Sequence, residues 1–192
     1  RARPWSAWAL GVQFGRQQAA IHTIAAPAAV CKHPTSWIAW ADPDNALRTC
    51  LRAAARGPDV LLHLDFHPMN VLVAGGLISG VIDWANTRAG DPRADLARTA
   101  AILRFAPFTS GLPHVLARVV RRVLIAGWRH GYREAAGPVK GMTPFYAWAG
   151  AVMMRDLAPR LGRPELPWIT PAFLEQVQRW ADAWRARAGC VG

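Results

Sequence analysis

Apolar residues recur along most of the chain at the spacing of one helical face. Leu10, Phe14, Ile21 and Ile24 lie close to one stripe, which predicts a helix over residues 5–24. After Gly90 we expect four further helices, each opening at or beside a proline, a residue favoured at the first helical position. Their expected bounds are about 92–105, 113–132, 143–161 and 170–188. The pattern therefore predicts a mostly helical fold.

Prolines interrupt the helical pattern between residues 25 and 58. Residues 25–36 contain Pro27 and Pro34 and are predicted to form a linker. Asp42 and Pro43 then predict the start of a helix, because Asp42 can cap the free amides and Pro43 needs no N–H at the first helical position. We expect this helix to end near residues 56–58.

Two short apolar runs flank a polar loop in the middle of the chain. Residues 60–62 lead into the loop as a buried strand would, and residues 71–73 lead out of it. Residues 74–76 offer a turn, and residues 77–82 return the chain as the second strand of a hairpin. Such a hairpin would carry Asn70 and Asp83 to the same end of the sheet. The expected fold class is mostly α with a small β-hairpin or sheet.

The composition indicates one ordered domain over residues 1–192. The chain is 52% hydrophobic and has ten tryptophans, which is enough for a buried core. Arg, His or Pro interrupts every apolar run before it reaches the length of a membrane span, and no signal-peptide pattern is present, so we expect no membrane partner and a cytoplasmic location. The three cysteines, at 31, 50 and 190, show no metal-site spacing, and we expect reduced structural thiols rather than a zinc site or a disulfide framework.

The formal charge of +11 comes almost entirely from arginine, since only two of the 23 basic residues are lysines. A basic excess can indicate nucleic-acid binding. Here the arginines are spread over several predicted helices without a nucleic-acid motif, and a compositional bias explains them more simply. We therefore expect no nucleic-acid partner.

Residues 63–70 read His-Leu-Asp-Phe-His-Pro-Met-Asn, which is the H-x-D-x-x-x-x-N spacing of a kinase catalytic loop. Asp83 follows the predicted hairpin as a second acidic residue. Oxygen ligands from Asn70 and Asp83, next to Asp65, form a plausible magnesium site. The pattern indicates phosphoryl transfer.

The motif resembles the aminoglycoside phosphotransferase and choline kinase-like family, which has a protein-kinase-like fold. It lacks the central Arg of the protein-kinase H-R-D, and Asp-Trp-Ala replaces D-F-G at residues 83–85. Further segments similar to the family pattern are residues 20–27 (AIHTIAAP), 80–84 (GVIDW), 90–92 (GDP) and 95–97 (DLA).

The resemblance implies a role for each matching residue. Asp65 is the catalytic aspartate that accepts or orients the proton of the attacking hydroxyl, and Asn70 and Asp83 are the metal ligands. His63 braces the catalytic loop, and Asp95 hydrogen-bonds that loop and holds it in place. The implied cofactors are ATP and Mg²⁺, and the implied partner is a small molecule with a hydroxyl acceptor.

Other interpretations of these residues remain open. His63, Asp65 and His67 could form an H-x-D-x-H cluster for zinc or another transition metal, although this leaves Asn70 and Asp83 unused. The role of His67 is open. The carboxylate of Asp95 could simply stabilise the N-terminus of a helix. The sequence indicates no partner for four other histidines, His22, His33, His114 and His130, which are expected to be surface or core residues. We expect five aromatic residues in the core: Trp128, Tyr132, Tyr146, Trp148 and Trp180.

An N-terminal lobe of the kinase-like fold is not recognisable in the sequence. No G-x-G-x-x-G precedes Asp65, and neither Lys32 nor Lys140 lies on a plausible early strand, so no nucleotide-binding Lys is assigned. We therefore expect a C-terminal lobe only, with the catalytic loop and metal hairpin at about 60–84 and a helical acceptor region at about 92–188.

Two functional hypotheses follow. The first is an ATP-dependent small-molecule phosphotransferase, whose missing N-terminal lobe would leave this chain with little activity alone. The second is a non-catalytic helical binding or scaffold domain derived from a truncated kinase. The acceptor, the substrate-binding residues and the oligomeric state are not specified by the sequence, and few acidic residues in the C-terminal third would meet a polycationic substrate.

Overall fold

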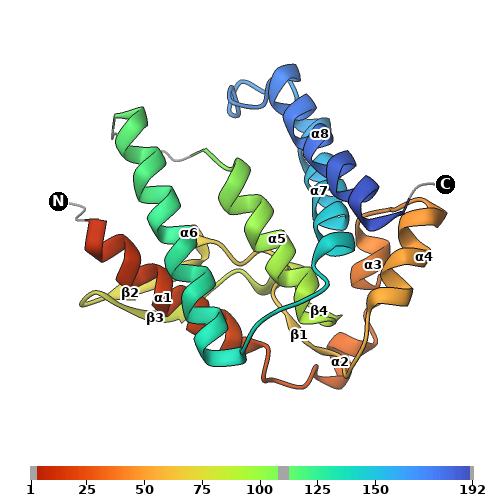
Figure 1. The fold of residues 1–192 in the computed structure, drawn as a ribbon, viewed down its shortest axis with the longest axis horizontal. Helices are drawn as coiled ribbons and strands as arrows, with labels where there is room; N and C mark the ends of the chain where they lie inside the picture. The colour runs from red at the N-terminus through yellow and green to blue at the C-terminus, as the bar shows by residue number, and fades with distance from the viewer. Residues whose placement is uncertain (1–3, 108–112, 191–192) are drawn as a thin grey trace.

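The computed structural model describes residues 4–107 and 113–190. Long helices dominate, and the strands are short (Figure 1). The helices are α1 (Pro4–Ile21), α2 (Ala28–Cys31), α3 (Trp37–Trp40), α4 (Asn45–Ala54), α5 (Pro92–Phe105), α6 (His114–Ala136), α7 (Thr143–Leu157) and α8 (Pro171–Ala188). The strands are β1 (Val60–Leu62), β2 (Val71–Ala74), β3 (Leu77–Val81) and β4 (Arg88–Gly90), and the 3-10 turns are η1 (Pro68–Asn70), η2 (Trp84–Asn86) and η3 (Ala158–Arg160). The prediction of a mostly helical fold is confirmed.

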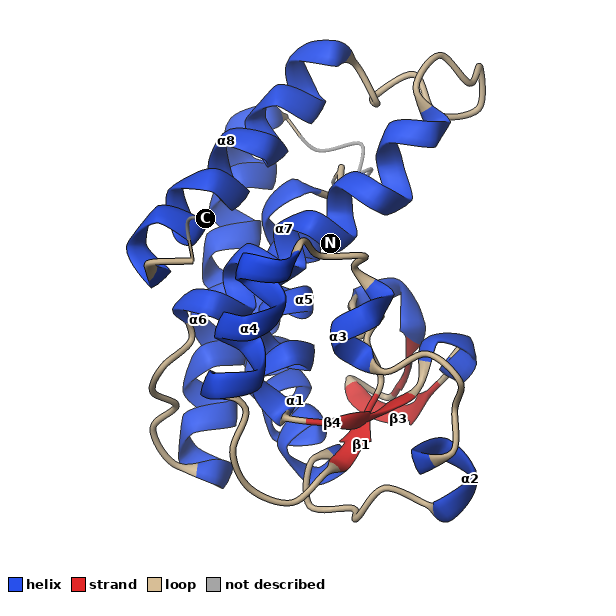
Figure 2. Cartoon of the chain, turned by 90° about the vertical axis from the view of Figure 1, so that its right-hand side faces the viewer, coloured by secondary structure: helices blue, strands red, loops and turns tan. Residues whose placement is uncertain are grey.

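The four strands form two small antiparallel sheets, shown in red in Figure 2. β2 and β3 make the predicted hairpin, with Val71 opposite Val81 and Ala74 opposite Leu77. Gly75 and Gly76 have φ values of 59° and 80°, a region that glycine adopts without steric cost. The open end of the hairpin therefore carries η1 and Asn70 on one side and Asp83 on the other.

The second sheet was not predicted from the sequence. β4 pairs with β1, with Val60 opposite Gly90 and Leu62 opposite Arg88. Gly90 is also where the ring of Trp37 packs, since a Cβ on Gly90 would lie 2.2 Å from Trp37 Cδ1. This sheet joins the segment before the loop at residues 63–70 to the segment that enters α5.

Helix boundaries were predicted well where local capping signals were clear. Asp91 caps α5 by accepting a hydrogen bond from Arg93 N, and Thr170 caps α8 by accepting one from Phe173 N. The predicted cap at Asp42 was wrong, because Asp42 lies in the left-handed region with φ 47° and α4 begins at Asn45. Its cap is Asp44, whose carboxylate accepts a hydrogen bond from Leu47 N. The short helix α2 interrupts the predicted linker, and the short helix α3 directly follows it.

Helix α5 lies at the centre of the molecule, between the α1–α6 pair and the α7–α8 pair (Figure 1). One face of α5 places Ala97 and Ala101 in a core built from α3, α4, α7 and α8. Another face places Leu96 and Leu103 in a second core with α1 and α6. The first turn of α5 points Asp95 at the loop that follows β1, as described below. The helix thereby connects both cores to the candidate site.

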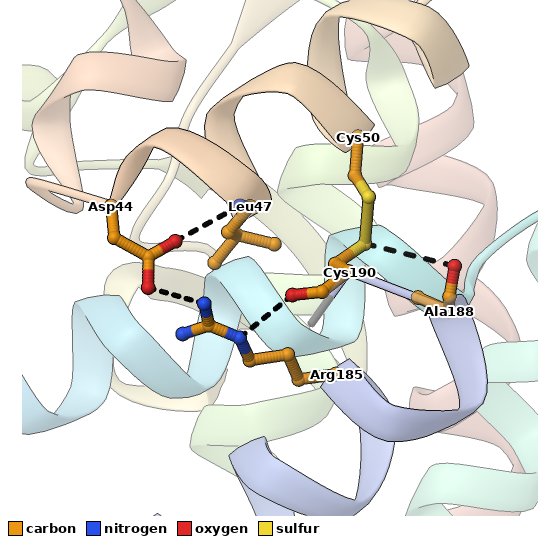
Figure 3. The surroundings of a disulfide bond; sticks show 6 residues. All are labelled: Asp44, Leu47, Cys50, Arg185, Ala188 and Cys190. Atoms are coloured by element: carbon orange, nitrogen blue, oxygen red, sulfur yellow. Dashed lines mark hydrogen bonds and ion pairs between the residues drawn. A yellow bond between two sulfur atoms is a disulfide. The ribbon is translucent and has the colours of Figure 1, made fainter. Parts of the chain in front are cut away.

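The expectation that the cysteines are reduced is wrong for two of them. Cys50 in α4 and Cys190 after α8 form a disulfide across 140 residues of sequence, while Cys31 is free and exposed. Arg185 in α8 adds two contacts beside the disulfide. It donates to the Cys190 carbonyl oxygen at 2.9 Å and forms an ion pair with Asp44, the cap of α4 (Figure 3). The pairing was not predictable from spacing, because it depends on how α8 folds back on α4.

None of the helices in the described part of the chain is long and apolar enough to cross a membrane.

Candidate active site

The loop after β1 is anchored in both hydrophobic cores. Leu64 is fully buried in the core around α7, and Phe66 is fully buried in the core around α1 and α6. Phe66 also stacks on Phe14, with ring centroids 4.1 Å apart. Asp65 lies between these two anchors with its side chain 23% exposed. The loop therefore presents one carboxylate to solvent from a rigidly held backbone.

The backbone of Leu64 is held on both sides. Its φ of 60° lies in the left-handed region, which costs a branched residue free energy. Asp95 Oδ1 accepts a hydrogen bond from Leu64 N at 2.6 Å, and Asp95 Oδ2 accepts one from His63 N at 3.3 Å. Arg98 Nε donates to the Leu64 carbonyl oxygen at 3.4 Å. Asp95 and Arg98 thus fix the conformation that turns Asp65 outward.

The carboxylate of Asp95 is fully buried and satisfied. His22 Nε2 lies 3.0 Å from Asp95 Oδ2, and His22 Nδ1 lies 2.8 Å from the Tyr132 hydroxyl. Burial alone would raise the pKa of Asp95, but the hydrogen bond and charge of His22, with the backbone N–H of Leu64, hold the pKa below its usual range. The pKa of Tyr132 shifts upward instead, because burial and the nearby negative charge of Asp95 both raise it.

A second buried chain of hydrogen bonds supports the loop at Phe66, two residues after Leu64. Trp128 Nε1 donates to Gln18 Oε1 at 2.8 Å, and Gln18 Nε2 donates to Thr99 Oγ1 at 2.9 Å. Thr99 Oγ1 donates to the Phe66 carbonyl oxygen at 3.0 Å. Helices α1, α5 and α6 therefore each contribute a polar side chain to the position of the loop.

The carboxylate of Asp65 faces basic side chains. His67 Nε2 lies 3.7 Å from Asp65 Oδ1. Partial burial would raise the pKa of Asp65, but the hydrogen bond and charge of His67 and the charges of Arg98 and His63 together lower it. Asp65 is therefore ionised at neutral pH and able to orient a hydroxyl group.

Asn70 and Asp83 come together at the open end of the hairpin, because Ile82 N donates to the Asn70 carbonyl oxygen at 2.9 Å. Asn70 Nδ2 donates to the Asp65 carbonyl oxygen at 3.0 Å and lies 3.5 Å from Asp65 Oδ2. This leaves the amide oxygen of Asn70 available as a ligand. Asp83 is exposed, has a left-handed backbone with φ 61°, and makes no capping hydrogen bond with its side chain. An amide oxygen and a carboxylate suit a hard cation such as Mg²⁺.

His63 uses both ring nitrogens within the loop and hairpin. Its Nε2 donates to the Ile82 carbonyl oxygen at 3.0 Å, and its Nδ1 accepts from Asp65 N at 3.3 Å. The ring also lies against Trp84, with centroids 4.6 Å apart. These bonds argue against the H-x-D-x-H metal cluster, and among the described residues no three His, Cys, Asp or Glu side chains form a group that could hold a metal ion.

A cavity of about 460 Å³ opens beside Asp65. It lies between α3, the loop after β1, α5 and α7, with Trp40, Ile102 and Trp168 among its apolar walls. Its size falls within the range of small-molecule sites. The cavity gives Asp65 a neighbouring space in which an acceptor molecule could lie.

The loop, the hairpin and a mostly helical scaffold with small antiparallel sheets are consistent with a kinase-like fold. Residues 6–148 match the model of the phosphotransferase enzyme family, and the chain therefore belongs to that family, which confirms the resemblance seen in its motifs. A solved structure of a "putative aminoglycoside phosphotransferase" from Ralstonia eutropha JMP134 superimposes with a TM-score of 0.60. The match covers 98% of this chain and 67% of that one at 16% sequence identity, so it shows a shared fold. No curated protein sequence matches the chain significantly.

Several supporting residues were missed in the sequence. His22 was expected to be an unpartnered core or surface residue, but it is a buried partner of Asp95. Gln18, Thr99 and Arg98 carried no signal at all, because each acts through contacts with residues more than 30 positions away. Only His22 had a usable hint, since it lies in the segment 20–27 that resembles the family pattern.

Proposed function

We propose that this chain carries the catalytic loop and metal hairpin of an ATP-dependent kinase that phosphorylates a hydroxyl of a small molecule. The observation that supports this most directly is the position of Asp65. Its carboxylate is ionised, held by two buried neighbours, hydrogen-bonded to Asn70 and open to a cavity of about 460 Å³. Phosphoryl transfer depends mainly on positioning and electrostatic stabilisation, for which such a rigid carboxylate is suited.

In the proposed reaction Asp65 accepts the proton of the acceptor hydroxyl. The hydroxyl oxygen forms its bond to the γ-phosphorus of ATP as the bond from that phosphorus to the ADP oxygen breaks, so the products are a phosphate ester and ADP. Asn70 and Asp83 would hold Mg²⁺, which would neutralise charge on the phosphate oxygens. Asp95 and His63 are positioning residues, because they act on the loop backbone and the hairpin.

We further propose that these residues form the C-terminal lobe of the kinase-like fold. In that fold a phosphate-binding loop and a strand lysine lie on a separate N-terminal lobe. The two lysines of this sequence are Lys32, at the end of α2, and Lys140, in the loop before α7, and both are remote from the hairpin in sequence. The 192-residue chain alone is accordingly expected to turn over slowly.

The metal assignment is tested by adding Mn²⁺ and ATP to the 192-residue protein and recording backbone NMR spectra. Bound Mn²⁺ is expected to broaden the amide signals around Asn70 and Ile82 selectively. Asp83→Asn is expected to weaken this binding by about tenfold or more, because it removes the charged ligand. Asp59→Asn is the matched control, since Asp59 is an exposed loop carboxylate that precedes β1.

The catalytic assignment is tested with radiolabelled ATP and a panel of small alcohols. Slow transfer is expected, and Asp65→Asn should reduce it by about 10²- to 10⁴-fold, the usual contribution of a general base. Absence of both nucleotide-dependent Mn²⁺ binding and Asp65-dependent transfer would favour the alternative of a non-catalytic binding domain. Fast transfer by the 192 residues would instead contradict the proposed dependence on a second lobe.

A further inference from the structure

The cavity beside Asp65 is lined by more positive than negative side chains. Three arginines, Arg98, Arg155 and Arg160, meet two carboxylates, Asp65 and Asp156. Two of the arginines come from different helices, Arg98 from α5 and Arg155 from α7, and Arg160 follows in η3. The arginines of the lining therefore outnumber its carboxylates by one, even with Asp65 counted as ionised.

Asp156 is neutralised within this cluster. Its Oδ2 accepts from Arg98 Nη2 at 2.7 Å, and its Oδ1 accepts from Arg155 Nη2 at 2.7 Å. Arg155 is fixed further by its bond to the Trp40 carbonyl oxygen and by the Trp40 ring, whose centroid lies 4.6 Å from the guanidinium carbon. Asp156 thus orients two guanidinium groups, and their positive charges compensate its negative charge.

Arg98 lines this cavity and has one side-chain donor without a hydrogen-bond partner in the described part of the chain. Its side chain is only 7% exposed, and its Nη1 is buried without a hydrogen-bond partner among the described residues. Leaving a buried charged donor unsatisfied costs free energy, which a ligand oxygen would recover. Arg160 is exposed and has no carboxylate partner in the part of the chain that the structure describes. Both arginines can therefore bind an anion.

We propose that the acceptor is an alcohol that also carries an anionic group, a carboxylate or a phosphate ester. The anion binds to Arg98 and Arg160, while the hydroxyl lies toward Asp65, and the apolar walls formed by Trp40, Ile102 and Trp168 cover the carbon skeleton. Guanidinium groups bind carboxylates and phosphates through paired hydrogen bonds. The same arginines repel ammonium groups, so a polycationic acceptor is disfavoured.

This inference rests on the proposed kinase function for the role of the hydroxyl, but the anion site can be measured separately. Calorimetry at fixed ionic strength compares four probes with the 192-residue protein: glycerate, glycerol 3-phosphate, glycerol and serinol. The two anionic alcohols are expected to bind at least about tenfold more tightly than glycerol, as one charge-assisted hydrogen bond suffices for this ratio. Serinol, which is cationic, is expected to bind more weakly than glycerol.

Arg160→Glu is the principal variant, because Arg160 is exposed and its replacement leaves the buried cluster intact. It should abolish the preference for anionic alcohols and leave glycerol binding unchanged. Arg163→Glu changes the same charge on an exposed residue that does not line the cavity, and it is expected to have little effect. Arg98→Lys, checked for folding by circular dichroism, keeps the charge but removes Nη1 and should also weaken anion binding.

The outcomes separate this inference from the kinase proposal. Equal binding of all four probes, or equal effects of Arg160→Glu and Arg163→Glu, would overturn the anion site. Arg160-dependent anion binding without any Asp65-dependent phosphoryl transfer would retain the anion site and count against the kinase function. Asp65-dependent transfer to glycerol and serinol in preference to the anions would retain the kinase function and refute the anionic acceptor.

Discussion

Leu64 and Asp83 are non-glycine residues with left-handed backbone conformations, and both belong to the candidate site. Such conformations cost about 1–3 kcal/mol each and persist only where surrounding contacts enforce them. For Leu64 these contacts are complete side-chain burial and two polar partners, Asp95 at its N–H and Arg98 at its carbonyl. The backbone conformation that exposes Asp65 is therefore stabilised by α5.

Replacing Asp95 with asparagine tests this support directly. An amide has one acceptor oxygen in place of two, so it cannot accept from Leu64 N, His63 N and His22 as Asp95 does. At pH 7 we expect Asp95→Asn to lower the free energy of unfolding by about 1–3 kcal/mol, the penalty for unsatisfied buried groups. Urea denaturation followed by tryptophan fluorescence measures the loss, with Asp59→Asn as an exposed control.

The pH dependence of this loss of unfolding free energy shows whether it comes from the charge of Asp95 or from its packing. Because the pKa of Asp95 is lowered in the folded protein, its ionised form contributes stability at pH values above the ordinary carboxyl pKa of 3.8. This contribution disappears as the pH falls from 3.8 through the lowered pKa of the native state. The difference between the wild type and Asp95→Asn should therefore shrink below pH 4, and a constant difference would assign the effect to packing.

The sequence identified residues of the candidate site only where a motif included them. Asp65, Asn70, Asp83 and Asp95 stand at spacings that resemble a family pattern. Gln18 and Thr99 do not, because their hydrogen bonds join α1, α5 and the loop across 81 and 33 positions. A polar side chain within an apolar helix has no local feature that identifies such a distant partner.

At the scale of elements, the pairing of α1 with α6 depends on glycine. A Cβ added to Gly15 would lie 2.1 Å from the Trp128 carbonyl oxygen, and one added to Gly131 would lie 2.1 Å from the Val12 carbonyl oxygen. Real Cβ atoms do not approach backbone atoms so closely. The two helices therefore pack backbone against backbone, and this brings Gln18 and His22 within reach of Trp128 and Tyr132.

Gly131→Ala gives a test in which two effects have opposite signs. Helix propensity alone would stabilise the variant by about 0.8–1 kcal/mol, since alanine is the better helix former. The overlap with Val12 should outweigh this and destabilise the protein by about 1–3 kcal/mol, as overpacked cores do. Thermal denaturation measures the sign, and Ala9→Gly at an exposed position of α1 calibrates the propensity term. A rise in Tm for Gly131→Ala would contradict the close packing.

Elements with local signals were predicted well, and those without them were not. The range of α5 was predicted as 92–105 because Pro92 marks its first helical position, and the structure adds Asp91 as its cap. The same signal at Asp42 and Pro43 was misleading, since the chain turns there before Asp44 caps α4. β4 is three residues long and forms a strand only because β1 lies beside it.

At the scale of the whole molecule, the disulfide between Cys50 and Cys190 joins the end of the chain to α4. A cross-link over 140 residues restricts the unfolded chain strongly. We expect Cys190→Ser to lower the free energy of unfolding by about 2–5 kcal/mol. In a domain of this size that corresponds to a fall in Tm of roughly 5–15 °C, measurable by scanning calorimetry.

Two controls separate the cross-link from the contacts around it. Cys31→Ser removes the free, exposed thiol and is expected to leave Tm unchanged. Adding dithiothreitol should lower the Tm of the wild type to that of Cys190→Ser and should not affect that variant. Since the Asp44–Arg185 pair still joins α8 to α4 after reduction, the Mn²⁺ binding proposed for the candidate site should persist at 25 °C. Alkylation before reduction should label one cysteine, and labelling of three would restore the original expectation of reduced thiols.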